Sequence, residues 1–158
     1  MLGLGYPGGP LVDRLAKRGD PKAVAFPRPR RRGAPMDFSF AGLKTAVRQH
    51  IESPERASDE DICASFQAAV IDCLMERVRL ARDQTGLKRL GLAGGVAANS
   101  LLRAEVEGLS KQGVEVFVPP RARCTDNGTM IAYAGRLHLM AGESDDWTGC
   151  VRSSWPLS

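Results

Sequence analysis

The stretch KRLGLAGGVAANSLLRAEVEGLSKQGVEVFVPP, residues 88 to 120, decides the fold class of this 158-residue chain. Its apolar residues first cluster as in a strand, then recur at helical spacing, and then cluster again before two prolines. The stretch predicts a strand over Leu90–Ala93, a helix over Ala98–Lys111 that Gly113 stops, and a second strand over Val114–Val118. A strand, a helix and a strand in this order form one βαβ unit with parallel strands. The predicted fold class is therefore α/β.

Two glycines and an asparagine follow the first of these strands. Gly94, Gly95 and Asn99 are expected at the carboxyl ends of the parallel strands, where such folds bind ligands. Glycines there let backbone N–H groups approach an anion or a ring, and the amino terminus of the following helix adds a positive dipole. The third glycine of a dinucleotide fingerprint is missing, so a tight packing turn is the alternative interpretation.

The rest of the chain is mainly helical by pattern. Apolar residues at every third and fourth position predict a long helix that begins after Ser58 and ends at Gly86. The other predicted elements are a helix over Pro10–Arg18, a short strand over Met36–Phe40 and a helix that continues to about Ile51. We interpret residues 1–158 as a single lobe with a Pro/Arg-rich loop at 19–35 and an irregular tail at 142–158.

An arginine cluster is the main charged feature of the chain. The formal net charge of +4 and the isoelectric point near 9.1 permit a polyanionic partner without requiring one. The proline-stiffened loop carries four arginines, Arg28, Arg30, Arg31 and Arg32. Because the planar guanidinium group suits phosphate, this loop is a candidate contact for a nucleic-acid backbone. A solvated surface loop explains the same residues equally well.

The cysteines and the apolar runs indicate the compartment. Four cysteines lie far apart with no CxxC or Cys/His cluster, which disfavours a structural zinc site and makes Cys63 and Cys73 candidate helix-core residues. No apolar run reaches the roughly 18 residues of a membrane span. The first ten residues also lack the pattern of a signal peptide. Together these features predict a cytoplasmic protein without a membrane partner.

A single carboxylate, Asp126, stands at the head of a mostly apolar helix in CTDNGTMIAYAGRL. It can cap that helix through the N–H groups of Gly128 or Thr129. It can also bind a cation, which would need further ligands that this sequence does not supply in an obvious pattern. His50 and His138 are isolated, and we interpret both as surface or hydrogen-bonded helix residues rather than ligands.

Six motifs in one order across nearly the whole chain resemble the carboxyl-terminal half of the tRNA threonylcarbamoyladenosine transferase family, known as TsaD in bacteria. They are YPGGP (6–10), FPRP (26–29), DFSFAGLKTAV (37–47), SFQ (65–67), LAGGVAANSLLR (92–103) and CTDNGTMIAYAG (124–135). The resemblance implies an actin/Hsp70/sugar-kinase-like fold of two α/β lobes around a nucleotide cleft. This chain would be the second lobe, with a helical insertion.

The resemblance also implies roles for individual residues. Gly9, Gly94, Gly95 and Asn99 fall where the family holds the nucleotide portion of threonylcarbamoyl-AMP. Asp126 falls on a ligand of one divalent metal, iron or zinc, whose other protein ligands are two histidines of a first-lobe HxxxH helix absent from this sequence. No catalytic side chain is implied in this chain. The arginine loop becomes a candidate contact for the tRNA backbone.

The implied reaction is transfer of the threonylcarbamoyl group from threonylcarbamoyl-AMP to N6 of the adenosine 3′ of the anticodon in ANN-decoding tRNAs. The implied partners are tRNA, a paralogous TsaB-type subunit and a TsaE-type ATPase. Met1 opens directly onto the expected tail of a helix, so we expect an incomplete part of the enzyme that binds metal weakly and is inactive alone. The alternatives are a related carbamoyltransferase and a non-catalytic lobe that binds a nucleotide or a partner.

Overall fold

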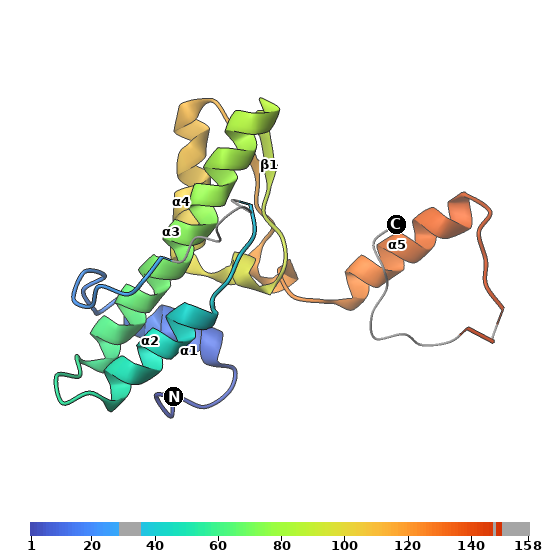
Figure 1. Cartoon of the computed structure of the whole chain (residues 1–158). Helices are drawn as coiled ribbons and strands as arrows, with labels where there is room; N and C mark the ends of the chain where they lie inside the picture. The colour runs from blue at the N-terminus through green and yellow to red at the C-terminus, as the bar shows by residue number, and fades with distance from the viewer. Residues whose placement is uncertain (29–35, 147, 150–158) are drawn as a thin grey trace. The chain divides into compact units, whose positions relative to one another are not determined.

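The computed structural model describes residues 1–28, 36–146 and 148–149, and in these the chain forms two compact units, Met1–Cys124 and Thr125–Ser158. The first unit contains α1 (Gly8–Ala16), α2 (Ala41–Glu52), α3 (Asp59–Thr85), β1 (Arg89–Gly91), α4 (Ser100–Gly108) and β2 (Glu115–Phe117), with short 3-10 turns at Gly95–Ala98, Leu109–Gln112 and Arg121–Arg123 (Figure 1). The second unit contains α5 (Gly128–Met140). None of the helices in the described ranges is long and apolar enough to cross a membrane. The single-lobe interpretation of residues 1–158 stays a prediction.

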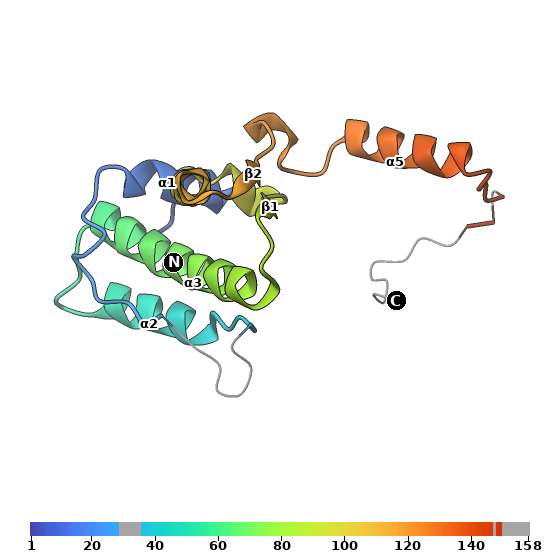
Figure 2. The same cartoon turned by 90° about the horizontal axis from the view of Figure 1, so that it is seen from above.

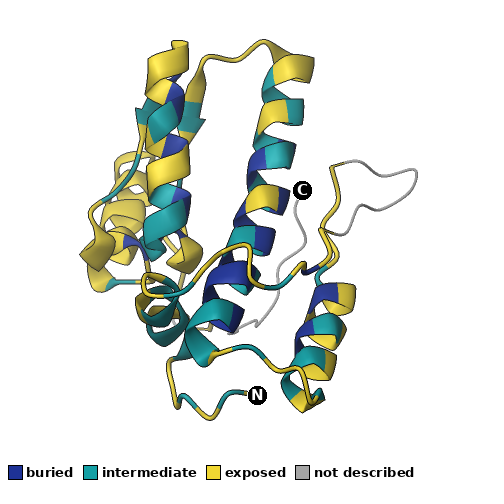
Figure 3. Cartoon of the chain, turned by 90° about the vertical axis from the view of Figure 1, so that its left-hand side faces the viewer, coloured by how far each residue is buried: buried dark blue, intermediate teal, exposed yellow. Residues whose placement is uncertain are grey.

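The long helix α3 forms the centre of the first unit. Ser58 caps it by accepting a hydrogen bond from the N–H of Asp61, and Gly86 ends it in the left-handed conformation at φ 68°, as the sequence predicts. α3 lies between α1 and α2 (Figure 2), and buried residues gather along it (Figure 3). Its first half packs on Phe26, Leu43 and Val47, and its second half packs on a separate cluster. That second cluster contains Ile71, Met75, Leu102, Val106, Leu109 and Val114.

The predicted βαβ unit is confirmed. β1 and β2 are parallel, with Leu90 opposite Val116, and α4 connects them. The predicted helix over Ala98–Lys111 is wrong at both ends, because Asn99 is extended at ψ 131° and the last turn from Leu109 is a 3-10 turn. Gly113 stops this turn at φ 77°, as expected. The fold class is a mixed helical structure with a small parallel sheet.

The predicted strand over Met36–Phe40 is wrong, because these residues are irregular up to the start of α2. Phe38 and Phe40 alternate with polar residues as in a strand, yet within the described part of the chain only β1 and β2 pair. The two rings instead stack at 6.0 Å between centroids, and the Arg77 guanidinium lies over the Phe38 ring at 5.7 Å. The alternation of Phe38 and Phe40 with polar residues therefore reflects stacking of the two rings and not the pairing of a strand.

The turn after α1 is fixed to the start of α3. Asp20 donates its backbone N–H to the Asp61 carboxylate at 2.7 Å, and Arg18 pairs with Glu60 at 2.9 Å. The hydrogen bonds from the Asp20 N–H and the Ser58 hydroxyl lower the pKa of Asp61. Gly19 lies between these pairs, and a methyl group there would collide with the backbone carbonyl of Glu60. This contact sets how α1 lies on α3.

We expect Gly19→Ala to lower the free energy of unfolding by about 1–3 kcal/mol, because the backbone of α3 cannot retreat from the added carbon. Urea denaturation measures the change. The matched control is Gly42→Ala, since an added methyl group on α2 meets nothing within 4 Å. The control should keep or raise stability, and equal losses in both variants would contradict the close approach of Gly19 to Glu60.

Candidate functional site

Gly94 and Gly95 follow β1 at its carboxyl end, where the sequence analysis expects them. Gly94 has φ 84° and ψ 172°, a conformation that is essentially restricted to glycine. An added methyl group at Gly94 would meet no atom within 4 Å, so the backbone conformation alone requires glycine there. The chain can turn sharply at this point and leave its backbone open to a ligand.

Asn99 caps α4 and has a structural role. Its Oδ1 accepts the N–H of Leu102 at 3.0 Å, and its Nδ2 donates to Oε1 of Gln67 at 2.8 Å. Gln67 comes from α3 and is buried. An amide has two N–H groups and two lone pairs, so one donor and one acceptor of Asn99 remain for a ligand. The sequence analysis did not identify Gln67 as a partner, although a polar residue within the mostly apolar α3 was a usable signal.

Asp13 of α1 ties the same end of α4 to another helix. Its Oδ1 accepts hydrogen bonds from the backbone N–H and the hydroxyl of Ser100, at 3.0 and 2.7 Å. Gly9 precedes Asp13 by four residues on α1, so both lie on one face of that helix. The structure thus brings the helix face of Gly9 to the start of α4, next to Asn99. Asp13 did not figure in the sequence analysis.

Asp126 is exposed and does not cap α5. Asn127 caps it, because its Oδ1 accepts the N–H of Met130 at 3.2 Å. The capping alternative for Asp126 is therefore wrong by one residue. Among the residues that the structure describes, no group of three or more His, Cys, Asp or Glu side chains could hold a metal ion. The Asp126 carboxylate alone does not make a metal site.

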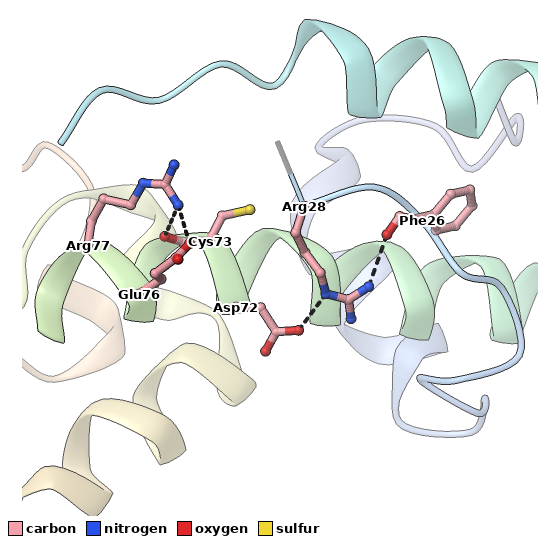
Figure 4. A network of polar contacts seen from close by, with 6 residues as sticks. All are labelled: Phe26, Arg28, Asp72, Cys73, Glu76 and Arg77. Atoms are coloured by element: carbon pink, nitrogen blue, oxygen red, sulfur yellow. Dashed lines mark hydrogen bonds and ion pairs between the residues drawn. The ribbon is translucent and has the colours of Figure 1, made fainter. Parts of the chain in front are cut away.

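Arg28 is the one loop arginine within the described residues, and Arg30, Arg31 and Arg32 lie outside them. Its Nε binds Oδ2 of Asp72 at 2.8 Å, and its Nη1 donates to the carbonyl of Phe26 at 2.9 Å (Figure 4). The Arg28 side chain is still 42% exposed. It can reach a phosphate only in competition with Asp72.

The cysteines and histidines of the described ranges have structural roles. Cys63 and Cys73 are buried in α3, as predicted, and burial raises the pKa of both thiols. They therefore stay protonated at neutral pH and are poor nucleophiles. His50 accepts the backbone N–H of Ala57 at its Nε2, 3.1 Å away, and His138 pairs with Glu143. Neither histidine lies in a ligand cluster.

The comparisons with known proteins point to one family. The family model described as TsaD: tRNA N6-adenosine threonylcarbamoyltransferase matches residues 1–133. Curated relatives of that name include those of Trichlorobacter lovleyi, 48% identical over 99% of this chain and 47% of the relative, and Thermotoga neapolitana, 52% identical over 85% of this chain and 42% of the relative. The relative from Sorangium cellulosum is 49% identical over 92% of this chain and 42% of its own length.

The parallel strands β1 and β2, connected by α4, are compatible with the α/β class of proteins. Within that class, the chain belongs to the TsaD family of tRNA N6-adenosine threonylcarbamoyltransferases. The chain spans about half the length of the curated relatives it matches.

Asn99 caps α4 and also binds Gln67, and substitutions can separate these two contributions to stability. Asn99→Ala removes the cap and leaves the buried Gln67 without its hydrogen bond, so we expect the free energy of unfolding to fall by about 1–3 kcal/mol. Asn99→Ser keeps a capping oxygen but is too short to reach Gln67, so it should recover about 1 kcal/mol of that loss. Urea denaturation of both variants measures the difference. Equal stabilities of the Ala and Ser variants would contradict the capping role.

Proposed function

We propose that this chain provides the nucleotide-facing wall of an enzyme that transfers the threonylcarbamoyl group from threonylcarbamoyl-AMP to N6 of the adenosine 3′ of the anticodon in ANN-decoding tRNAs. The observation that carries the proposal is the family match over residues 1–133, which includes the contact of Asp13 on α1 with the start of α4. The proposed nucleotide contacts are Gly9, Gly94, Gly95 and Asn99. A second lobe of an actin/Hsp70/sugar-kinase-like fold is the architecture that we propose for the chain.

The charge at the start of α4 limits which part of the nucleotide binds there. Asp13 accepts the N–H of Ser100, and Asn99 accepts that of Leu102, so two of the orphan donors of this helix end are already used. The Asp13 carboxylate also occupies the position where a helix amino terminus would attract a phosphate. We therefore assign the uncharged adenosine, rather than the phosphate, to this wall.

The proposed reaction is an acyl transfer. The N6 amine attacks the carbamoyl carbon, a C–N bond forms, the C–O bond to the phosphate breaks, AMP leaves with the electron pair, and N6 loses a proton. The residues of this chain would hold the adenosine so that the acyl carbon lies within attack distance of the amine. We propose Asp126 as one ligand of a divalent metal, iron or zinc, that groups outside the described residues complete. Because the described residues do not form that site, no step is assigned to the metal.

The remaining proposals concern partners and compartment. We propose tRNA as the polyanionic partner of the arginine loop, with Arg28, Arg30, Arg31 and Arg32 contacting phosphates. A TsaB-type subunit, a TsaE-type ATPase and a cytoplasmic setting are consistent with the family. A non-catalytic lobe that binds nucleotide is the second candidate function, favoured by the absence of a metal-binding group among the described residues.

Incorporation of labelled threonine into unmodified tRNA tests the activity. With threonylcarbamoyl-AMP supplied, we expect none from the 158-residue chain, because its described residues hold no metal-binding group. A catalytically active protein that contains this chain should lose at least about nine-tenths of its rate with Asp126→Ala. Asp145→Ala, another exposed acid of the second unit, is the control and should keep the rate. Full activity of the Asp126 variant would contradict the assignment.

Salt dependence tests the role of Arg28. If Arg28 contacts a phosphate, Arg28→Ala should weaken tRNA binding and flatten the slope of log affinity against log salt by up to ~0.9. Asp72→Asn releases Arg28 from its ion pair and should strengthen binding. Filter binding over a salt series measures both. If both variants leave the slope unchanged, the Arg28–Asp72 pair is a surface contact only.

A further inference from the structure

The Arg103 side chain holds the turn that leads to Asp126. Arg103 lies in the first turn of α4, and its side chain is only 12% exposed. Its Nη2 donates to the carbonyl of Pro119 and to Sγ of Cys124, the latter at 3.3 Å. The nearest carboxylate, that of Glu107, lies at 4.0 Å from Nη1. One guanidinium group thus joins α4 to both ends of the turn after β2.

Cys124 is the second half of this contact. It is 4% exposed, and its thiol lies 3.5 Å from the carbonyl of Pro120 and can donate to it. The turn itself is closed by the N–H of Cys124, which donates to the carbonyl of Arg121 at 3.2 Å. Cys124 is the last residue of the first compact unit, and Asp126 follows it by two residues. The turn that Arg103 holds is therefore the last part of the first unit before the segment that carries Asp126.

Stability alone is a poor explanation for this arginine. Burying a guanidinium group is unfavourable unless its hydrogen bonds are satisfied, and the buried Nε of Arg103 has no hydrogen-bond partner among the described residues. An apolar side chain could fill the same space without that penalty. The two N–H groups of the Arg103 Nη2 can, however, address the carbonyl of Pro119 and the Sγ of Cys124 at once. Arg103 therefore fixes the geometry of the turn Pro119–Cys124.

We infer that Arg103 is a positioning residue that fixes the turn Pro119–Cys124, from which the chain continues directly to Asp126. The inference rests on the proposed role of Asp126 for its functional meaning. Arg103 also donates its backbone N–H to the carbonyl of Asn99 at 3.2 Å, so both residues belong to one turn of α4. The proposed nucleotide contact and the anchor of the Asp126 segment are therefore built on the same rigid piece of helix.

Thiol alkylation tests the anchor in the 158-residue chain. Wild-type protein and the variants Arg103→Gln, Arg103→Lys and Arg121→Gln are treated with iodoacetamide, and the modified peptides are quantified by mass spectrometry. Arg103→Gln should speed alkylation of Cys124 by about tenfold or more, because a buried charged hydrogen bond is lost. Arg103→Lys keeps one charged donor and should have a smaller effect. Arg121→Gln, an exposed arginine in the same turn, should have none.

The buried thiols of α3 distinguish local loosening from unfolding. Cys63 and Cys73 are each 1% exposed and should stay protected in every variant. Hydrogen exchange of the peptide over residues 124–130 should rise in Arg103→Gln only. If Cys124 stays as protected as in the wild type, or if Cys63, Cys73 and Cys124 react together in both Arg103 variants, the inference is wrong.

A kinetic measurement connects the anchor to the reaction. In a catalytically active protein that contains this chain, Arg103→Gln should lower kcat by about 10- to 100-fold, since small misplacements of reacting groups have effects of that size. KM for threonylcarbamoyl-AMP should stay unchanged. A raised KM with an unchanged kcat would overturn the positioning role. The alkylation result holds even if the protein transfers no threonylcarbamoyl group, so failure of the proposed function and failure of this inference are distinguishable.

Discussion

The start of α4 is held by side chains from two other helices, and the candidate site depends on this constraint. Gln67 of α3 binds the amide of Asn99, and Asp13 of α1 binds Ser100. α3 is buried against both core clusters, so it gives this junction a rigid base. Without these bonds, the helix that carries Gly9 and the glycine turn after β1 would have no polar link between them.

At this junction the amino terminus of α4 is bound by a side chain of the protein and is not free to bind an anion. A free amino terminus attracts anions because its N–H groups are unsatisfied and its dipole is positive. Here a carboxylate from within the protein already satisfies that end. The open backbone near Gly94 is then the part of this wall that we propose faces the uncharged adenosine. The glycine positions alone would allow either the phosphate or the adenosine at this wall, and the Asp13 carboxylate favours the adenosine.

Helix caps, helix stops and the βαβ unit were predictable from the sequence, whereas the side-chain partners of other segments were not. The Ser58 cap, the Gly86 and Gly113 stops and the parallel strand pair all follow from short-range patterns, and all were confirmed. The strand over Met36–Phe40 failed because pairing needs a neighbouring strand, which alternation cannot supply. The predicted helix start at Ala98 was wrong for a related reason, because the chain is extended at Asn99. Its side chain competes with the helix backbone, and its partner Gln67 lies 32 residues away in the sequence.

The candidate site divides in the same way. The motifs supplied Gly9, Gly94, Gly95, Asn99 and Asp126, and the roles of these residues stay predictions. Asp13, Gln67 and Arg103 came only from the structure, because a polar residue reveals itself as a support only when its burial and its partner are known. Since Asn99 caps α4 and Arg103 lies in its first turn, any shift of that turn must move both the proposed nucleotide contact and the turn Pro119–Cys124. A contact and a turn that are held by one helix end keep their spacing, and reacting groups need a spacing that is constant to a fraction of an ångström.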